Sequence, residues 1–182
     1  MSKRALILID IQNDYFEGGK WTLEGMDSAT ANAARVLSAA RETGDKVIHV
    51  RHEFGSDDAP FFAPGSTGAN IHTLVHPLAG EAVVLKHQVN AFLGTDLKAR
   101  LDDAGIEQVT LVGAMSHMCI DAAARASSDF GYATTVIHDA CATRDQAFEG
   151  QSIAAAQVHA AYMAALAFAY ASVVSTEQYL AG

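Results

Sequence analysis

The chain has 182 residues, of which 50% are hydrophobic and 18% charged, so its composition is that of a globular protein with a sizeable core. Its formal net charge of −9 disfavours binding to nucleic acids and to anionic membrane surfaces. We therefore expect a single domain over residues 1–182, with neither a nucleic acid nor a membrane as a partner.

The cysteine count and the apolar runs bear on where the protein works. Two cysteines are too few for the disulfide framework of a small secreted domain. The apolar run at residues 5–9 is too short for a signal peptide, and no run approaches the ~18 apolar residues of a membrane-spanning helix. These features predict a cytoplasmic protein.

Short apolar runs alternate along the chain with segments of helical spacing. Glycines follow several of the helical segments, as they do at helix C-termini, and one long segment rich in Gly, Pro, Ser and Asp shows no period. In chain order we expect a strand at 5–9, a helix at 27–43, a strand at 46–50, a loop at 53–76, a strand at 81–85, a helix at 96–104, a strand at 108–112, a helix at 118–130, a strand at 133–137, a helix at 151–170 and a strand at 171–174.

This alternation predicts the fold class. Wholly apolar strands separated by helices are typical of a parallel sheet that is covered on both faces. We therefore expect a three-layer α/β/α fold of the Rossmann-like kind, with a mainly parallel six-stranded sheet. In such folds the ligand binds beyond the carboxyl ends of the strands, so polar residues at those ends are the first candidates for a functional site.

Reactive side chains follow the expected strands in several places. Asp10, His52, Lys86 and Asp139 stand at or just after four of them, and Cys119 follows the strand at 108–112. Each has an ordinary structural interpretation when taken singly. The carboxylates can cap a helix, a lysine can extend to solvent, and a cysteine is often a small core residue.

Taken together, Asp10, Lys86 and Cys119 form a chemically coherent set. A thiol at the start of a helix is expected to have a lowered pKa, and a carboxylate can accept its proton and later deliver it to a leaving amine. An ammonium group between them would offset the repulsion of two negative charges. Cys141 has no such setting, and we interpret it as structural.

Two phosphoryl-transfer alternatives use an aspartate after the first strand. A haloacid-dehalogenase-type phosphatase needs a second aspartate two residues later, where this chain has Gln12, so that interpretation fails. A receiver-type phosphoacceptor also pairs an aspartate with a lysine, and it predicts Mg²⁺-dependent phosphorylation of Asp10. It stays a distant alternative.

Ordered motifs over residues 3–177 indicate a family. They are Ala5-Leu6-Ile7-Leu8-Ile9-Asp10-Ile11-Gln12-Asn13-Asp14-Tyr15-Phe16, Val84-Leu85-Lys86, Asn90-Ala91-Phe92-Leu93-Gly94-Thr95, Val112-Gly113-Ala114-Met115-Ser116-His117-Met118-Cys119-Ile120, Gly131-Tyr132 and His138-Asp139-Ala140. In this order and spacing the chain resembles the isochorismatase-like cysteine hydrolase superfamily, which includes nicotinamidases, N-carbamoylsarcosine amidohydrolase and ureidoacrylate hydrolases.

The resemblance implies a reaction on a small-molecule substrate. Asp10 would be the general base and acid, Lys86 the electrostatic partner and Cys119 the nucleophile that forms a thioester with an amide carbonyl. It also implies a cis peptide bond between Ala114 and Met115, with the backbone N–H groups of Met115 and Cys119 forming an oxyanion hole.

The resemblance further implies a set of residues around the substrate. Gln12 and Asp139 would support the catalytic residues. The side chains expected at the substrate pocket are Phe16, His52, Phe92, Ser116 and His117.

A metal site and a cofactor are not expected. Nicotinamidases use an Asp-x-His motif after the second strand, which this chain lacks, although a zinc site built from His52, His72 and His76 is an alternative. True isochorismatases, which cleave a vinyl ether, often have another residue at the cysteine position. Cys119 therefore favours amide, lactam or ureido hydrolysis over ether cleavage. A non-catalytic binding or redox-sensing protein on the same fold is the remaining alternative.

Three segments have two possible roles each. Residues 13–26 form either a lid or an anchored loop, and loops such as residues 53–76 lie near the pocket or a neighbouring subunit in the family. The alanine-rich helix at 151–170 is either a core helix or a subunit interface. We expect a homo-oligomer, a dimer or a tetramer as in many relatives, and monomeric behaviour would contradict this.

Overall fold

The computed structural model describes residues 3–182 and contains two sheets, five α-helices and short single-turn helices. The strands are β1 (Arg4–Ile9), β2 (Lys46–His52), β3 (Ala82–Lys86), β4 (Gln108–Ala114), β5 (Ala133–Ala142), β6 (Gln146–Phe148), β7 (Gln151–Ile153) and β8 (Ser172–Val174). The α-helices are α1 (Met26–Thr43), α2 (Leu97–Asp103), α3 (Asp121–Asp129), α4 (Ala155–Ala169) and α5 (Thr176–Leu180).

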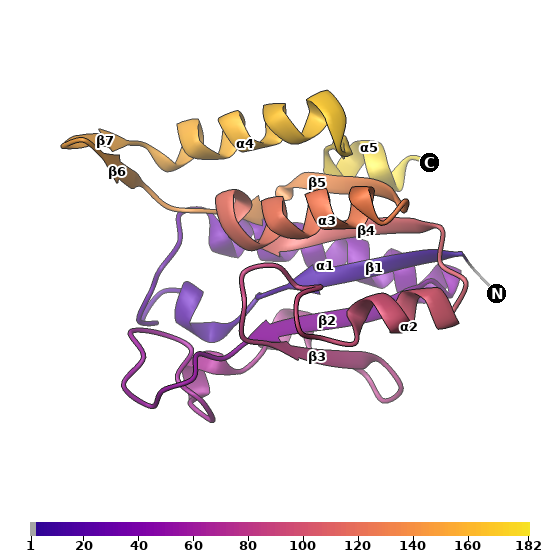
Figure 1. The fold of residues 1–182 in the computed structure, drawn as a ribbon, viewed down its shortest axis with the longest axis horizontal. Helices are drawn as coiled ribbons and strands as arrows, with labels where there is room; N and C mark the ends of the chain where they lie inside the picture. Colours follow the sequence, from indigo (N-terminus) through magenta and orange to yellow (C-terminus); the bar gives the residue numbers. More distant parts are fainter. Residues whose placement is uncertain (1–2) are drawn as a thin grey trace.

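Six strands form one parallel sheet in the order β3-β2-β1-β4-β5-β8. Helices cover both faces of this sheet, with α1 behind it and α2 and α3 in front of it (Figure 1). The predicted three-layer α/β/α fold with a parallel six-stranded sheet is therefore confirmed.

Strand β1 shows why its sequence is apolar throughout. Leu6 and Leu8 belong to the core cluster under α1, whereas Ile7 and Ile9 belong to the cluster on the opposite face. Successive side chains of a strand point to opposite faces, so a central strand covered by two layers needs an apolar residue at every position.

A register shift lengthens β5 at the end of the sheet that holds the loops. Leu111 pairs with Val136, but Gly113 pairs with Cys141, so β5 has additional residues in between. Gly113 has a φ of 125°, and a Cβ there would stand 2.0 Å from the carbonyl oxygen of Ile9. Only glycine allows β4 to approach β1 so closely at this point.

The structure corrects several element bounds. The expected helix at 151–170 begins at Ala155, because residues 151–153 form β7, which pairs with β6 in an unpredicted hairpin. The expected helix at 118–130 is a π-helical turn at Ser116–Ile120 followed by α3. The short helix α5 was not expected, although Ser175 and Gln178 form a capping box at its start.

The two ends of the sheet differ. The chain termini lie at one end, and the loops after β1 and β2 lie at the other, where the β6–β7 hairpin projects from the body (Figure 1). Within residues 3–182, no helix has both the length and the apolar composition needed to cross a lipid bilayer.

Candidate active site

The sheet topology brings together three residues that are distant in the sequence. Asp10 directly follows β1, Lys86 is the last residue of β3, and Cys119 lies in the π-helical turn after β4. Strands β1 and β4 are neighbours, and the connections that follow them lead to α1 on one face and α3 on the other. Strands β2 and β3 are added on one side of β1, and β4 and β5 on the other, so the strand order reverses between β1 and β4. Doubly wound sheets bind ligands at such a point.

Lys86 is at the centre of this group. Its Nζ atom lies 2.8 Å from Asp10 Oδ2, 3.4 Å from Cys119 Sγ and 3.0 Å from His52 Nδ1. Asp10 and Lys86 have 0% of their surface exposed, and Cys119 has 7%. A buried ammonium needs such partners, because an unpaired charge in the interior is strongly destabilising.

The charges in the group shift the pKa values of its members. Burial lowers the pKa of Lys86, but the charge of Asp10 and the hydrogen bonds to Asp10 and Cys119 outweigh it, so the pKa is raised and the ammonium persists. Burial, and next the charge of Asp10, raise the pKa of the Cys119 thiol well above its ordinary value, and Lys86 offsets only part of this. The expected lowering of the thiol pKa is therefore wrong for the free protein, because burial and Asp10 outweigh the helix terminus and the lysine.

The chemical consequence concerns the proton of Cys119. A thiol with a raised pKa keeps its proton, so the sulfur becomes a nucleophile only when a base takes that proton during the attack. Asp10 is the carboxylate in this group, and its neighbour Lys86 already carries a positive charge. The arrangement can therefore perform nucleophilic catalysis in which the proton moves as the sulfur attacks.

The backbone around Cys119 has an unusual conformation. The peptide bond between Ala114 and Met115 is cis, and the carbonyl oxygen of Met115 accepts hydrogen bonds from the N–H groups of Met118 and Ile120. Cys119 thus lies in a π-helical turn that precedes α3, not in the first turn of the α-helix itself.

A cavity of about 240 Å³ opens onto these residues. Its lining combines polar groups with an aromatic wall, which is contributed mainly by the loop after β2. Its lining residues are Asp10, Tyr15, His52, Phe54, Phe61, Phe62, His87, Gln88, Val89, Met115, Met118 and Cys119. The expectation that residues 53–76 lie near the pocket agrees with this geometry.

Of the five side chains expected at the pocket, the structure places His52 on the lining and the other four elsewhere. Phe16 stacks on His72 with ring centroids 3.9 Å apart, and Phe92 packs edge-on against Phe130. Both rings are held in neighbouring clusters and neither lines this cavity, so a contact of these two residues with the substrate stays a prediction.

Ser116 and His117 point to other partners as well. The Ser116 hydroxyl lies 2.8 Å from His159 Nδ1 and donates to the carbonyl oxygen of Ala142, while His117 Nδ1 lies 2.6 Å from Thr143 Oγ1. Both side chains therefore connect the π-helical turn to the C-terminal half of the fold. They do not line the cavity described above.

The two residues expected to support the site have different surroundings. The buried side chain of Gln12 donates to the carbonyl oxygens of His52 and Ala69 and accepts from the N–H of His52. Asp139 instead accepts hydrogen bonds at 2.7 Å from the N–H and hydroxyl groups of Thr176. Gln12 thus holds the wall of the pocket, whereas Asp139 anchors α5 to β5.

The histidines of the alternative zinc site do not form a metal-binding cluster. Among residues 3–182, no three or more His, Cys, Asp or Glu side chains are grouped so that they could hold a metal ion. His52 contacts Lys86 instead, and burial together with that positive charge lowers its pKa to about 4. His72 is engaged with Phe16.

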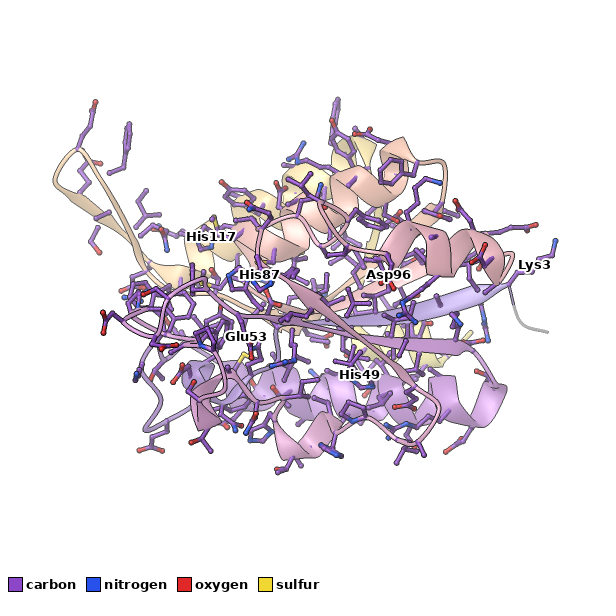
Figure 2. The ribbon with its side chains drawn as sticks, turned by 60° about the horizontal axis from the view of Figure 1, so that its bottom comes forward. Lys3, His49, Glu53, His87, Asp96 and His117 are labelled. Carbon is purple, nitrogen blue, oxygen red and sulfur yellow. The ribbon has the colours of Figure 1, made fainter. Side chains whose placement is uncertain are left out.

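Several lining residues were not predicted from the sequence. His87, Gln88 and Val89 follow β3 immediately, and Met118 precedes Cys119. The same rule that identified Lys86 at a strand end could have extended to the three residues after it. His87 and Glu53 lie toward the loop-rich end of the sheet, and Lys3 lies at the opposite end (Figure 2).

Comparisons with known proteins agree with this geometry. The chain is 46% identical over 176 residues to the isochorismatase family protein YddQ of Bacillus subtilis, covering 97% of this chain and 98% of that protein. A crystal structure of an isochorismatase hydrolase from Oleispira antarctica superposes with a TM-score of 0.95 at 55% identity, covering 98% and 96% of the two chains.

A more distant relative is named for its activity. The maleamate amidohydrolase of Pseudomonas putida is 29% identical over 159 residues, which cover 78% of this chain and 73% of that protein. The family model described as the isochorismatase domain matches residues 4–177, nearly all of the chain. The protein therefore belongs to the isochorismatase family.

Proposed function

We propose that this protein is a cysteine-dependent amidohydrolase that cleaves a C–N bond of a small amide, lactam or ureido compound. The observation that carries the proposal is the buried Lys86 ammonium, which lies 2.8 Å from the Asp10 carboxylate and 3.4 Å from the Cys119 sulfur, beside a cavity of about 240 Å³. A relative that is an amidohydrolase supports the same reaction class.

The reaction begins with attack of Cys119 on the substrate carbonyl. As the S–C bond forms, the thiol proton passes to Asp10, and the carbonyl electrons move onto oxygen. The backbone N–H groups of Met115 and Cys119 would stabilise this oxyanion. A donor of this kind typically lowers the activation barrier by about 3–4 kcal/mol. Lys86 keeps its positive charge beside both reacting groups throughout.

Collapse of the intermediate breaks the C–N bond. Asp10 returns the proton to the leaving nitrogen, which departs as an amine or ammonia and leaves a thioester on Cys119. A water molecule then attacks the thioester while Asp10 takes one of its protons. The thiolate leaves, regains that proton, and the carboxylic acid product is released.

The test combines turnover with detection of the acyl-enzyme. We expect release of ammonia or amine from a panel of small amides and ureides, and a covalent adduct on Cys119 in intact-protein mass spectra of quenched reactions. C119A should lose activity by at least about 10³-fold. C141A is the matched control, because that cysteine lies outside the cavity lining, and it should keep its activity. Full turnover by C119A would overturn the mechanism.

We further propose that the chain is one domain, works in the cytoplasm and assembles into a homo-oligomer. The two cysteines are free, which suits a reducing compartment. Helix α4 leaves Phe168 92% exposed, and the β6–β7 hairpin leaves Phe148 68% exposed. Large apolar side chains at such exposure are typical of surfaces that bind another protein chain.

A further inference from the structure

The contacts of Lys86 determine where His52 carries its proton. An ammonium group has three N–H donors and no acceptor, and Lys86 Nζ has three neighbours, Asp10, Cys119 and His52. The Nδ1 atom of His52, 3.0 Å away, must therefore accept the hydrogen bond. A neutral imidazole has one proton, which consequently resides on Nε2.

The same surroundings keep the imidazole neutral. Burial, and next the positive charge of Lys86, lower the pKa of His52 to about 4, and the opposing effect of Asp10 is smaller. His52 is thus a neutral hydrogen-bond donor at physiological pH, and it does not act as a general acid or base there.

The position of this ring is fixed from several sides. The rings of Phe54 and His52 pack edge-on with their centroids 4.5 Å apart. The Gln12 side chain also binds both the backbone N–H and the backbone carbonyl of His52. The ring is also 93% shielded from solvent, since His52 has 7% of its surface exposed. A donor held this firmly can select a ligand by geometry.

The Nε2–H group makes no close hydrogen bond within the described residues, and the backbone of Gln88 has only a small raising effect on the pKa of His52. It is buried without a hydrogen-bond partner among residues 3–182, although His52 lines the cavity beside Cys119. A buried donor without an acceptor is costly, and in native proteins it usually has a functional explanation. A substrate atom in the cavity would supply the missing acceptor.

We propose that His52 is a substrate-orienting residue whose Nε2–H donates a hydrogen bond to a second acceptor oxygen of the substrate. This inference rests on the proposed function, in which the scissile carbonyl oxygen binds the N–H groups of Met115 and Cys119. The substrates are therefore small amides that carry another carbonyl or carboxylate oxygen in addition to the scissile one.

The other residues of the cavity lining indicate the shape of the substrate between its scissile carbonyl and its second acceptor oxygen. Tyr15, Phe54, Phe61 and Phe62 present aromatic rings, which suit a flat, unsaturated or aromatic skeleton. Three probes of this shape differ in one substituent. Maleamide has a second neutral carbonyl, maleamate has a carboxylate, and cis-crotonamide has a methyl group that accepts no hydrogen bond.

Binding is measured by calorimetry in the C119A protein, so that no turnover is needed. We expect maleamide or maleamate to bind about tenfold more tightly than cis-crotonamide, as one hydrogen bond from a buried donor provides. H52N keeps an acceptor for Lys86, but its shorter side chain has no donor at the position of Nε2, so the preference for maleamide or maleamate should disappear. H52Q places an amide N–H near the position of Nε2 and should restore part of it.

The ratio between probes separates a specific role from structural damage. The inference is overturned if H52N weakens the binding of all three probes equally. It is also overturned if the C119A protein binds the three probes equally well or binds none of them. Comparing maleamide with maleamate shows whether the acceptor is neutral or anionic. Failure of hydrolysis in the wild-type protein would instead count against the proposed function alone.

A second measurement tests the proton position directly. Side-chain ¹⁵N NMR of the histidines should show His52 as the neutral Nε2–H form throughout pH 5 to 8. A K86M variant, if folded by its thermal transition, should lose this fixed form. Observation of the Nδ1–H form or of the doubly protonated ring in the wild-type protein would overturn the inference, whatever the probes do.

Discussion

The buried Asp10–Lys86 pair lies against a thiol that has no charge of its own. If Cys119 were ionised as well, the interior would hold two negative groups, and the single positive charge of Lys86 could balance only one of them. The raised pKa of Cys119 avoids this, because the free protein then holds one positive and one negative charge. This balance stabilises the free site, and in the proposed reaction the thiolate would develop only as the substrate accepts the sulfur.

This charge balance predicts the effect of D10N on alkylation of Cys119. The negative charge of Asp10 raises the thiol pKa, so removing that charge lowers the pKa and shifts the alkylation rate to lower pH. We expect the midpoint of the rate–pH curve for iodoacetamide to fall by about 1–3 pH units, the usual effect of one nearby charge. Peptide mass spectrometry follows each cysteine separately.

Two controls accompany this measurement. D14N neutralises another buried carboxylate, whose Oδ2 accepts from the N–H of Phe62, and it should leave the curve for Cys119 nearly in place. Cys141 lies outside the cavity lining and its pKa is raised to about 12, so it should stay unreactive in all variants. An unchanged midpoint in D10N, or an equal shift in D14N, would show that Asp10 does not control the thiol.

The sequence allowed some of these residues to be predicted and not others. Asp10, Lys86 and Cys119 follow buried strands, and parallel strands end at one edge of the sheet, so their proximity could be expected. The orientations of Phe16 and Phe92 depend on which neighbouring ring each one meets. That choice is made by packing between loops, and no spacing in the sequence encodes it.

The same contrast holds for helices and strands. The long helix α1 has a clear period and the central strands are continuous apolar runs, so the positions of these elements were predicted within a few residues. The β6–β7 hairpin has strands of three residues, too short for any period to show. Its turn uses Glu149 and Gly150 with positive φ values of 48° and 77°, and a glutamate gives little signal for such a turn.

The long loop after β2 carries the aromatic wall, and Gln12 is its main polar attachment near the site. Q12A leaves the N–H and carbonyl of His52 and the carbonyl of Ala69 without this partner. We expect it to lower the free energy of unfolding by about 1–3 kcal/mol, the cost of unsatisfied buried groups. Urea denaturation measures this, and kcat/KM should fall because the ring of His52 moves.

N13A provides a matched comparison for the same loop. The side chain of Asn13 also donates to a loop carbonyl, that of Thr67 at 2.9 Å, but this hydrogen bond is exposed to solvent. Water can replace it, so the free energy of unfolding should change by less than about 0.5 kcal/mol. Equal losses in Q12A and N13A would show that burial at Gln12 does not hold the wall.

The position of the site at one end of the fold leaves other surfaces free for assembly. The candidate catalytic groups lie at the carboxyl ends of β1, β3 and β4, while α4 packs against β8, α3 and the π-helical turn at Ser116–Ile120 and turns its other face outward. Helix α4 buries Val158, Met163 and Leu166 against its own chain, yet its outer face is mostly alanine with Phe168. Small side chains allow close approach of a second helix.

Assembly through this face makes a prediction about mass in solution. Light scattering should give a dimer or tetramer of the 19.2 kDa chain at micromolar concentration. F168E places a charge on the outer face of α4 near its C-terminal end, and burying it unpaired would cost several kcal/mol, so the mass should fall toward one chain. L93E changes a side chain that is 59% exposed on a different surface, and it should leave the mass unchanged. A wild-type protein that is monomeric at all concentrations would contradict the assembly, and a mass unaffected by F168E would place the interface elsewhere.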